Sequence, residues 1–260
     1  MNILNILGKI VNFLFSHEVW QNVWANVLFV VLSVLFFYAI FLIRKISKLY
    51  GILGLNQINR LTIYFSNTIT TNAIDVRGNP NLYSGSAVPE NEFRTIPDLF
   101  NLIIQIGEKD NLLLRFLKSL KFRKIMIDFE LSPDNEIRVE ANNNSNIFAI
   151  GGPGYNNATA FYQKQGTKLS FSGGGISNNT NVVAMPSMDY DYGILERISK
   201  NGQIIIIAAG FHINGTRGSV RYLINNWRSL PKKDFAYLIK FPHPSKDVNG
   251  YDKPLHVGKY

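Results

Sequence analysis

Residues 27–43 read VLFVVLSVLFFYAIFLI, and they lie within a longer stretch, residues 19–43, that contains no charged side chain. An α-helix rises about 1.5 Å per residue, so about 20 residues cross the roughly 30 Å hydrocarbon layer of a bilayer. Trp20 and Trp24 lie near one end, as interfacial aromatic side chains of membrane spans do. The stretch predicts a transmembrane helix over residues 19–45; the alternative is a buried helix of a soluble protein.

The basic residues next to this stretch predict its orientation. Arg44, Lys45 and Lys48 follow it, whereas only Lys9, the terminal amine and an offsetting Glu18 precede it. The positive-inside rule then places the larger C-terminal part in the cytoplasm and the N-terminus outside, as in a single-pass protein of the cell membrane. A cleaved signal peptide fits less well, because the charged segment and the cleavage-site pattern expected of one are not seen.

Residues 1–18 predict a second, amphipathic helix. Asn2, Asn5, Lys9, Asn12 and Ser16 recur at spacings of three and four, and apolar residues fill the rest of the helix surface. Such a helix could lie in the membrane interface. It could also pack against copies of itself in lipid, with the asparagine stripe facing inward, which predicts a homo-oligomer on activation. The sequence leaves both possibilities open.

The composition excludes several classes of chemistry. The 260 residues contain no cysteine, so disulfide scaffolds, thiol catalysis, cysteine-ligated zinc and iron–sulfur clusters are excluded. The four histidines do not form the HExxH pattern of zinc proteases. We therefore expect neither a metal nor a cofactor. Charged residues make up 17%, below the roughly 25% typical of soluble domains.

The formal net charge of +9 predicts a polyanionic partner, for which the anionic inner leaflet is the first candidate. Residues 201–260 carry nine lysines and arginines against three aspartates. A second basic run falls within a predicted helix at residues 111–122. The candidate contacts to lipid or another polyanion are Arg44, Lys45, Lys48, Arg115, Lys118, Lys121, Lys232 and Lys233.

The part from residue 46 to 245 predicts a cytoplasmic α/β domain with a Rossmann-like, mostly parallel sheet. Ile204 to Ile207 are four consecutive isoleucines, which is typical of a central strand covered by helices on both faces. Residues 246–260 are poor in apolar side chains and predict a partly mobile tail. Strands are expected at residues 61–65, 124–129, 136–140, 147–150, 169–172, 181–185, 203–208 and 235–241. Helices are expected at residues 97–108, 111–122, 157–164 and 216–228.

Two glycine-containing loops follow predicted strands. One is GGPGYNN at residues 151–157, and the other is GFHINGTRG at residues 210–218. Glycines at this place let backbone amides approach an anion at the next helix N-terminus. The second loop has the G-x4-G spacing of a phosphate loop but carries threonine in place of its lysine. The candidate ligand contacts are Gly151, Gly152, Asn156, Gly210, Gly215, Thr216 and Arg217. The alternative is that the glycines serve only tight turns.

Residues 188–196, MDYDYGILE, hold the acidic residues closest in sequence to these loops. If the protein is an enzyme, Asp191, Glu196 and His212 are the candidates for acid–base catalysis. Aspartates in such a stretch are more often turn residues, and a single loop histidine is more often incidental.

The order strand, GGP-x-x-N, DYG, strand, G-x4-GT, helix over residues 147–230 resembles a recurring prokaryotic domain of unsettled biochemistry. Joined to a membrane span, it resembles the membrane effectors of prokaryotic antiviral systems that work with short Argonautes or with cyclic nucleotides. The resemblance implies a cytoplasmic sensor protein or nucleotide-like signal that triggers the effector, which then clusters and breaches the membrane. It covers about a third of the chain, and no motif specifies which system.

The leading hypothesis is therefore a non-enzymatic, single-pass membrane effector in antiviral defence. A membrane-bound nucleotide or nucleoside hydrolase or transferase is the first alternative. A membrane-tethered nucleic-acid-binding module that uses the basic C-terminal residues is the second.

Overall fold

The computed structural model describes residues 3–14, 17–70, 85–107, 125–133, 136–179 and 181–260. The chain divides into two compact units, Met1–Lys45 and Ile46–Tyr260. The predicted helix at residues 111–122 lies outside the described residues, as do its candidate contacts Arg115, Lys118 and Lys121.

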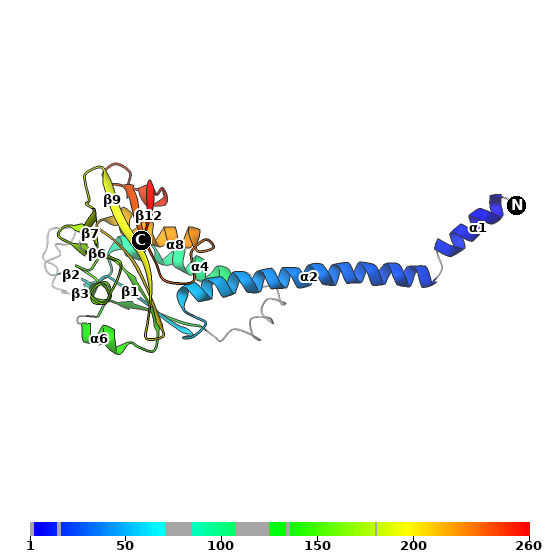
Figure 1. The fold of residues 1–260 in the computed structure, drawn as a ribbon, viewed down its shortest axis with the longest axis horizontal. Coiled ribbons are helices and arrows are strands. Elements are labelled where there is room, and N and C mark those ends of the chain that lie inside the picture. Colours follow the sequence, from blue (N-terminus) through cyan, green and yellow to red (C-terminus); the bar gives the residue numbers. More distant parts are fainter. Residues whose placement is uncertain (1–2, 15–16, 71–84, 108–124, 134–135, 180) are drawn as a thin grey trace. The chain divides into compact units, whose positions relative to one another are not determined.

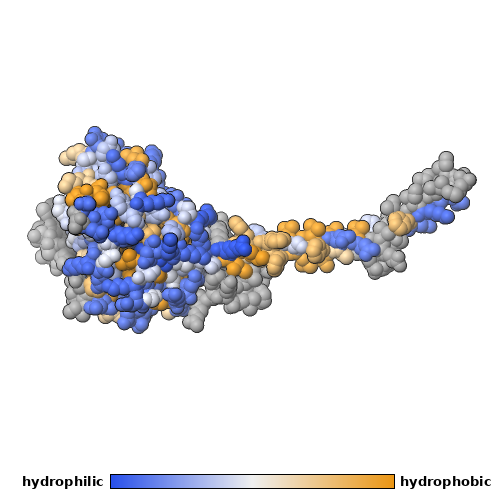
Figure 2. Space-filling model, viewed as in Figure 1, coloured by the Kyte–Doolittle hydropathy of each residue, from blue (hydrophilic) through white to orange (hydrophobic). Residues whose placement is uncertain are grey.

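Two helices make up the first unit (Figure 1). Helix α1 is Ile3–Leu14, and helix α2 is His17–Leu53, the end of which belongs to the second unit. Asn5, Lys9 and Asn12 of α1 are exposed. The segment Asn22–Phe41 of α2 is long and apolar enough to cross a membrane, and the described part of the chain buries none of it. Hydrophobic residues make up most of the visible surface of this helix in Figure 2.

The second unit is built on a seven-stranded sheet with the order β12-β11-β9-β10-β5-β1-β4. Strands β10, β5, β1 and β4 are parallel neighbours, while β9 is antiparallel to both β10 and β11, and β12 is antiparallel to β11. The mixed α/β class with a mostly parallel sheet is thereby confirmed. The strands are β1 Arg60–Phe65, β4 Met126–Leu131, β5 Asn146–Ile150, β9 Tyr190–Lys200, β10 Gln203–Gly210, β11 Phe235–Pro242 and β12 His256–Lys259.

Two smaller sheets and several short helices complete the described part of this unit. The sheets are formed by β2 Thr68–Thr70 with β3 Gly85–Ala87, and by β6 Leu169–Ser172, β7 Gly175–Asn178 and β8 Asn181–Ala184. The helices are α3 Glu90–Phe93, α4 Ile96–Gly107, α6 Glu136–Ala141, α7 Asn157–Gln163, α8 Ile213–Asn226 and the 3-10 turn η1 Gly250–Asp252.

A hydrophobic core lies on each face of the large sheet. On one face, side chains of the end of α2, of α4 and of α8 pack on the strands, and α4 and α8 lie beside each other in Figure 1. On the other face, α6, α7 and the sheet β6-β7-β8 provide the covering side chains. Ile206 faces the first core, and its neighbours Ile205 and Ile207 face the second. This alternation explains why the isoleucine run of β10 is apolar at every position.

The structure corrects three sequence predictions. Residues 136–140 were expected to form a strand, but they form α6, which buries Val139 and packs on α7. The expected turn around Asp191 is instead the start of β9, an 11-residue strand. The expected tail contains β12, which pairs with β11 as an edge strand. In each case, a tertiary partner decides the local structure.

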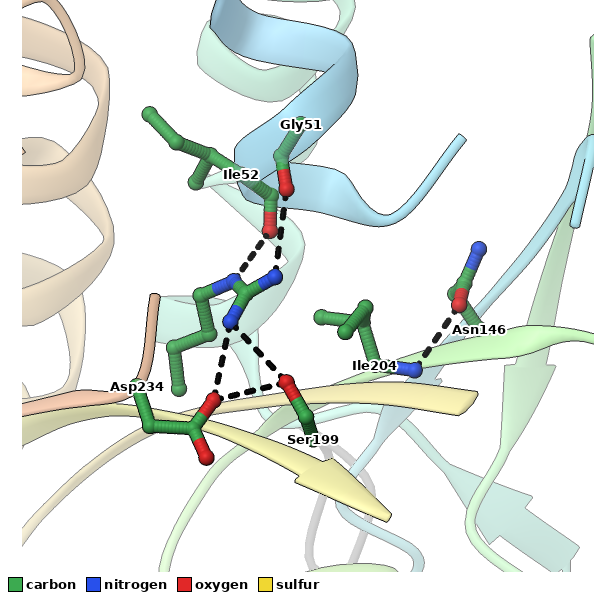
Figure 3. A network of polar contacts seen from close by, with 7 residues as sticks. Gly51, Ile52, Asn146, Ser199, Ile204 and Asp234 are labelled. Atoms are coloured by element: carbon green, nitrogen blue, oxygen red, sulfur yellow. Dashed lines mark hydrogen bonds and ion pairs between the residues drawn. The ribbon is translucent and has the colours of Figure 1, made fainter. Parts of the chain in front are cut away.

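Arg197 of β9 binds the C-terminal end of α2 within the second unit (Figure 3). Its Nε donates to the carbonyl oxygen of Ile52 at 3.0 Å, and its Nη2 donates to that of Gly51 at 3.2 Å. Its Nη1 donates to Asp234 at 2.9 Å and to Ser199 at 3.2 Å. The last carbonyls of a helix lack partners inside the helix, so a buried guanidinium stabilises this end.

Candidate functional site

A cleft lies at the sheet edge where the parallel strands β1, β5 and β10 end. Because these strands run in the same direction, the residues that follow Phe65, Ile150 and Gly210 meet at one edge. The cleft has a volume of about 430 Å³ and lies between the two glycine-containing loops and the short helix α3. It is lined by Pro89, Glu92, Gly152, Pro153, Gly154, Tyr155, Phe171, Gly210, Phe211, His212, Ile213 and Thr216.

The first loop is held close to β1 and α3 by Gly151. Its φ angle is +114°, in a region that side chains rarely adopt. A Cβ atom there would lie 2.1 Å from the Ser66 hydroxyl oxygen and 2.4 Å from a carboxyl oxygen of Glu92. At Gly152, a Cβ would be 3.3 Å from the carbonyl oxygen of Gly210, so the two loops nearly touch. Both glycines therefore serve close packing at the wall of the cleft.

The sequence reasoning missed Glu92, which is a buried carboxyl group in the cleft wall. It accepts hydrogen bonds from the Ser66 hydroxyl at 2.6 Å and from the Ser66 amide at 2.7 Å. Burial raises the pKa of Glu92 to about 7, although both hydrogen bonds from Ser66 act to lower it. No local signal points to Glu92, because its partner lies 26 residues earlier in the chain.

The side chain of Asp191, on the neighbouring strand β9, binds the N-terminus of α8. Its Oδ2 accepts from the amide of Gly215 at 2.6 Å, and its Oδ1 accepts from the amides of Tyr192 at 2.8 Å and His212 at 3.2 Å. Burial raises the pKa of Asp191, and the Gly215 hydrogen bond and the charge of His212 oppose this effect. The Gly215 amide, a candidate ligand contact, thus already binds an anionic group of the chain itself.

Asn156 is fully buried and holds the start of α7. Its side-chain oxygen accepts from the amides of Ala158 at 3.0 Å and Thr159 at 3.2 Å. Its side-chain nitrogen donates to the carbonyl oxygens of Ile150 at 2.8 Å and Tyr64 at 3.2 Å. Both donors and the acceptor are therefore engaged by backbone, as expected of an N-cap residue.

The other two candidate contacts, Thr216 and Arg217, separate in the structure. Thr216 lines the cleft. The Arg217 guanidinium lies 3.7 Å from the ring centroid of Tyr251, a residue that does not line the cleft, and this distance is typical of a cation–π contact.

The three candidate catalytic residues do not form one group. Asp191 and Glu196 are five positions apart on β9, so their side chains lie on opposite faces of the sheet. The Glu196 carboxylate accepts from the amides of Lys168 at 2.6 Å and Leu169 at 3.2 Å, where it holds the start of β6. His212 lines the cleft on the same side as Asp191.

A second histidine lies next to His212. The ring centroids of His212 and His243 are 4.9 Å apart, and His243 Nδ1 lies 2.7 Å from the Ser245 hydroxyl oxygen. Among the described residues, no three histidine, aspartate or glutamate side chains come close enough together to hold a metal ion.

The candidate lipid contacts come from distant parts of the sequence. Lys48 of α2 donates a hydrogen bond to the carbonyl oxygen of Arg228, which lies 180 residues later. The aliphatic part of Lys232 lies against Gly51 of α2, and Lys233 is exposed. The end of α2 and the segment that precedes β11 thus bring basic side chains together in the second unit. Arg44 is exposed in the first unit.

The two buried glutamates predict that the domain is more stable in mild acid. Burial raises the pKa of Glu196 to about 7, as it does for Glu92, from 4.5. Between these values the folded chain holds protons that the unfolded chain releases, so the free energy of unfolding falls as pH rises from about 5 to about 7. At about 1.4 kcal/mol per pKa unit, the change in unfolding free energy due to each glutamate is at most about 3.5 kcal/mol.

Urea titrations of the detergent-solubilised chain at several pH values measure this dependence. Glu196→Gln should flatten the pH dependence, because the substituted side chain does not titrate, whereas the exposed Glu140→Gln should leave it unchanged. A free energy of unfolding that rises between pH 5 and pH 7 would contradict the prediction.

The cleft thus combines a mostly apolar and aromatic lining with one buried carboxyl group, and no lysine or arginine is among the described residues that line it. Comparison of the chain with protein-family models, with curated proteins and with solved structures found no match.

Proposed function

We propose that this protein is a single-pass membrane effector. Its span is the segment Asn22–Phe41 of α2, and its α/β unit lies on the cytoplasmic side. The cleft binds a triggering ligand or a segment of a sensor protein, and clustering of the chains then disrupts the membrane, as the resemblance to antiviral effectors implies. The parallel strands β10-β5-β1-β4 support a Rossmann-like relationship, in which ligands bind at this sheet edge.

The observation that carries the proposal is the exposed apolar surface of α2. The segment Asn22–Phe41 comprises 20 residues, the length that crosses a bilayer, and the described residues of this chain bury none of it. Phe29 is 72% exposed and Phe37 is 68% exposed. Contiguous apolar surface of this extent is unfavourable in water and favourable in lipid.

The end of α2 belongs to the second unit. Leu49, Ile52 and Leu53 are buried in the core of the second unit, and Arg197 binds the last carbonyl groups of the helix. The last residues of α2 are thus core residues of the second unit.

The geometry gives less support to the two alternatives. The hydrolase hypothesis relied on Asp191, Glu196 and His212, of which Glu196 lies on the other face of the sheet. The nucleic-acid hypothesis relied on the basic C-terminal residues. Arg221, however, pairs with Asp98 and Asp252 at 2.7 Å each, and Lys240 lies 3.4 Å from the ring centroid of Tyr190.

Clustering of the reconstituted chain tests the proposal without knowledge of the trigger. The full chain, with an epitope tag at its C-terminus, is inserted into dye-loaded vesicles of phosphatidylcholine and phosphatidylglycerol. A bivalent antibody to the tag should release the dye, because it brings chains together, whereas its monovalent Fab fragment should not. If flotation shows inserted protein and the bivalent antibody leaves dye release at baseline, the effector function is wrong.

A further inference from the structure

The residues that line the cleft indicate the chemical class of its ligand. Five side chains present apolar or aromatic surface from several elements: Pro89, Pro153, Tyr155, Phe171 and Phe211. The rings of Phe171 and Phe211 pack edge to face with centroids 5.0 Å apart. Tyr155 is 67% exposed on the first loop and is therefore available to a ligand. Such a wall suits a flat ring system.

The charges at the cleft oppose a phosphate group. Glu92 is in the wall, and the carboxylate of Asp191 already binds the amides of His212 and Gly215 at the start of α8. The helix N-terminus, which would otherwise attract an anion, is thus neutralised from within the chain. A phosphate here would meet the carboxyl group of Glu92 and no lysine or arginine among the described lining residues.

Above about pH 7, where its carboxyl group is ionised, Glu92 can accept further hydrogen bonds. Each of its carboxyl oxygens accepts one hydrogen bond from Ser66, and a carboxylate oxygen has room for a second. The Ser66 contacts and the close approach of Gly151 fix the orientation of the group. A ligand that offers N–H groups at the edge of a ring therefore finds an oriented acceptor, as cytosine does when its amino group meets a glutamate.

We infer that the cleft binds an uncharged nucleoside or a similar N-heterocycle, with Glu92 accepting hydrogen bonds from ring-edge N–H groups and the aromatic wall contacting the ring face. This inference rests on the proposed function, in which the cleft is the ligand-sensing site, and it names the ligand class. It departs from the expectation of a phosphate-bearing ligand at the glycine-containing loops.

Calorimetric titration of the full chain in detergent tests the inference, with adenosine, guanosine, cytidine and uridine as probes and their 5′-monophosphates as matched anions. At least one nucleoside should bind saturably, and its monophosphate should bind about tenfold more weakly or worse, since like charges repel. Glu92→Gln should weaken nucleoside binding about tenfold. The substitution should also reduce the ratio of nucleoside affinity to monophosphate affinity, which a merely structural role of Glu92 would leave unchanged. The exposed Glu140→Gln should change neither.

Thermal unfolding of the Glu92→Gln variant shows whether it folds. If it does not, Tyr155→Ala, whose side chain is largely exposed, should fold and should lose about tenfold in nucleoside affinity. The inference is overturned if no nucleoside saturates, if a monophosphate binds as tightly as its nucleoside, or if inorganic phosphate displaces the nucleoside. Dye release after antibody clustering requires no ligand, so a failure here leaves the proposed effector function standing.

Discussion

Gly193→Ala is expected to lower the free energy of unfolding of the α/β unit by about 3 kcal/mol, the upper part of the usual range for overpacking. A Cβ atom at Gly193 would lie 2.2 Å from the carbonyl oxygen of Gly215 and 2.3 Å from the Ser219 hydroxyl oxygen. The first contact is with backbone, so α8 as a whole must move away from β9. That movement would also separate the Gly215 amide from Asp191 and loosen the core contacts of Val220.

Gly154→Ala is the matched control, because a Cβ at Gly154 meets nothing within 4 Å. This variant should stay within about 0.5 kcal/mol of the parent chain. Urea titration of the three proteins in the same detergent, followed by tryptophan fluorescence, gives the comparison. Equal unfolding free energies for Gly193→Ala and the parent chain would mean that α8 does not approach β9 this closely.

Arginine at both Leu32 and Leu35 is expected to move the full chain from the membrane fraction to the soluble or aggregated fraction. On the insertion scale, each apolar residue of the span contributes about −0.3 to −0.6 kcal/mol, so the segment Asn22–Phe41 gains roughly −5 kcal/mol in total. Each arginine near the helix centre costs about 2.5 to 3.5 kcal/mol, so two of them make the total insertion free energy unfavourable.

Isoleucine at the same two positions is the control, since it preserves the hydrophobicity of the helix. Carbonate extraction and vesicle flotation should leave the isoleucine variant in the membrane fraction with the parent chain. A double-arginine variant that still floats with vesicles would show that this segment does not hold the protein in lipid. The double-arginine variant also serves the dye-release experiment as a protein that should not breach vesicles.

The candidate site shows where local reasoning succeeds. Both glycine-containing loops follow predicted strands, and in the structure the loops at residues 151–157 and 210–218 line one cleft. Parallel strands end at the same edge, so a short pattern in the sequence predicts a meeting of residues about 60 positions apart.

The same reasoning could not supply the partners of the site residues. Glu92 lies in none of the predicted helices or strands, and only the tertiary structure places it beside Ser66 in the wall of the cleft. Asp191 was expected in a turn, yet it binds the start of α8 from an antiparallel strand. Asn156 was expected to contact a ligand, but the N-cap geometry engages its side chain.

The amino-acid order alone predicts the long apolar helix, the α/β class and the strands with continuous apolar runs. Each of these depends on the burial preference of neighbouring residues along the chain. The structure adds the direction of β9, the helix at Glu136–Ala141, the edge strand β12 and the Glu92 carboxyl group at the cleft. Each of these depends on contacts between segments far apart in sequence, where pairing and packing outweigh the weak local preference of a few residues.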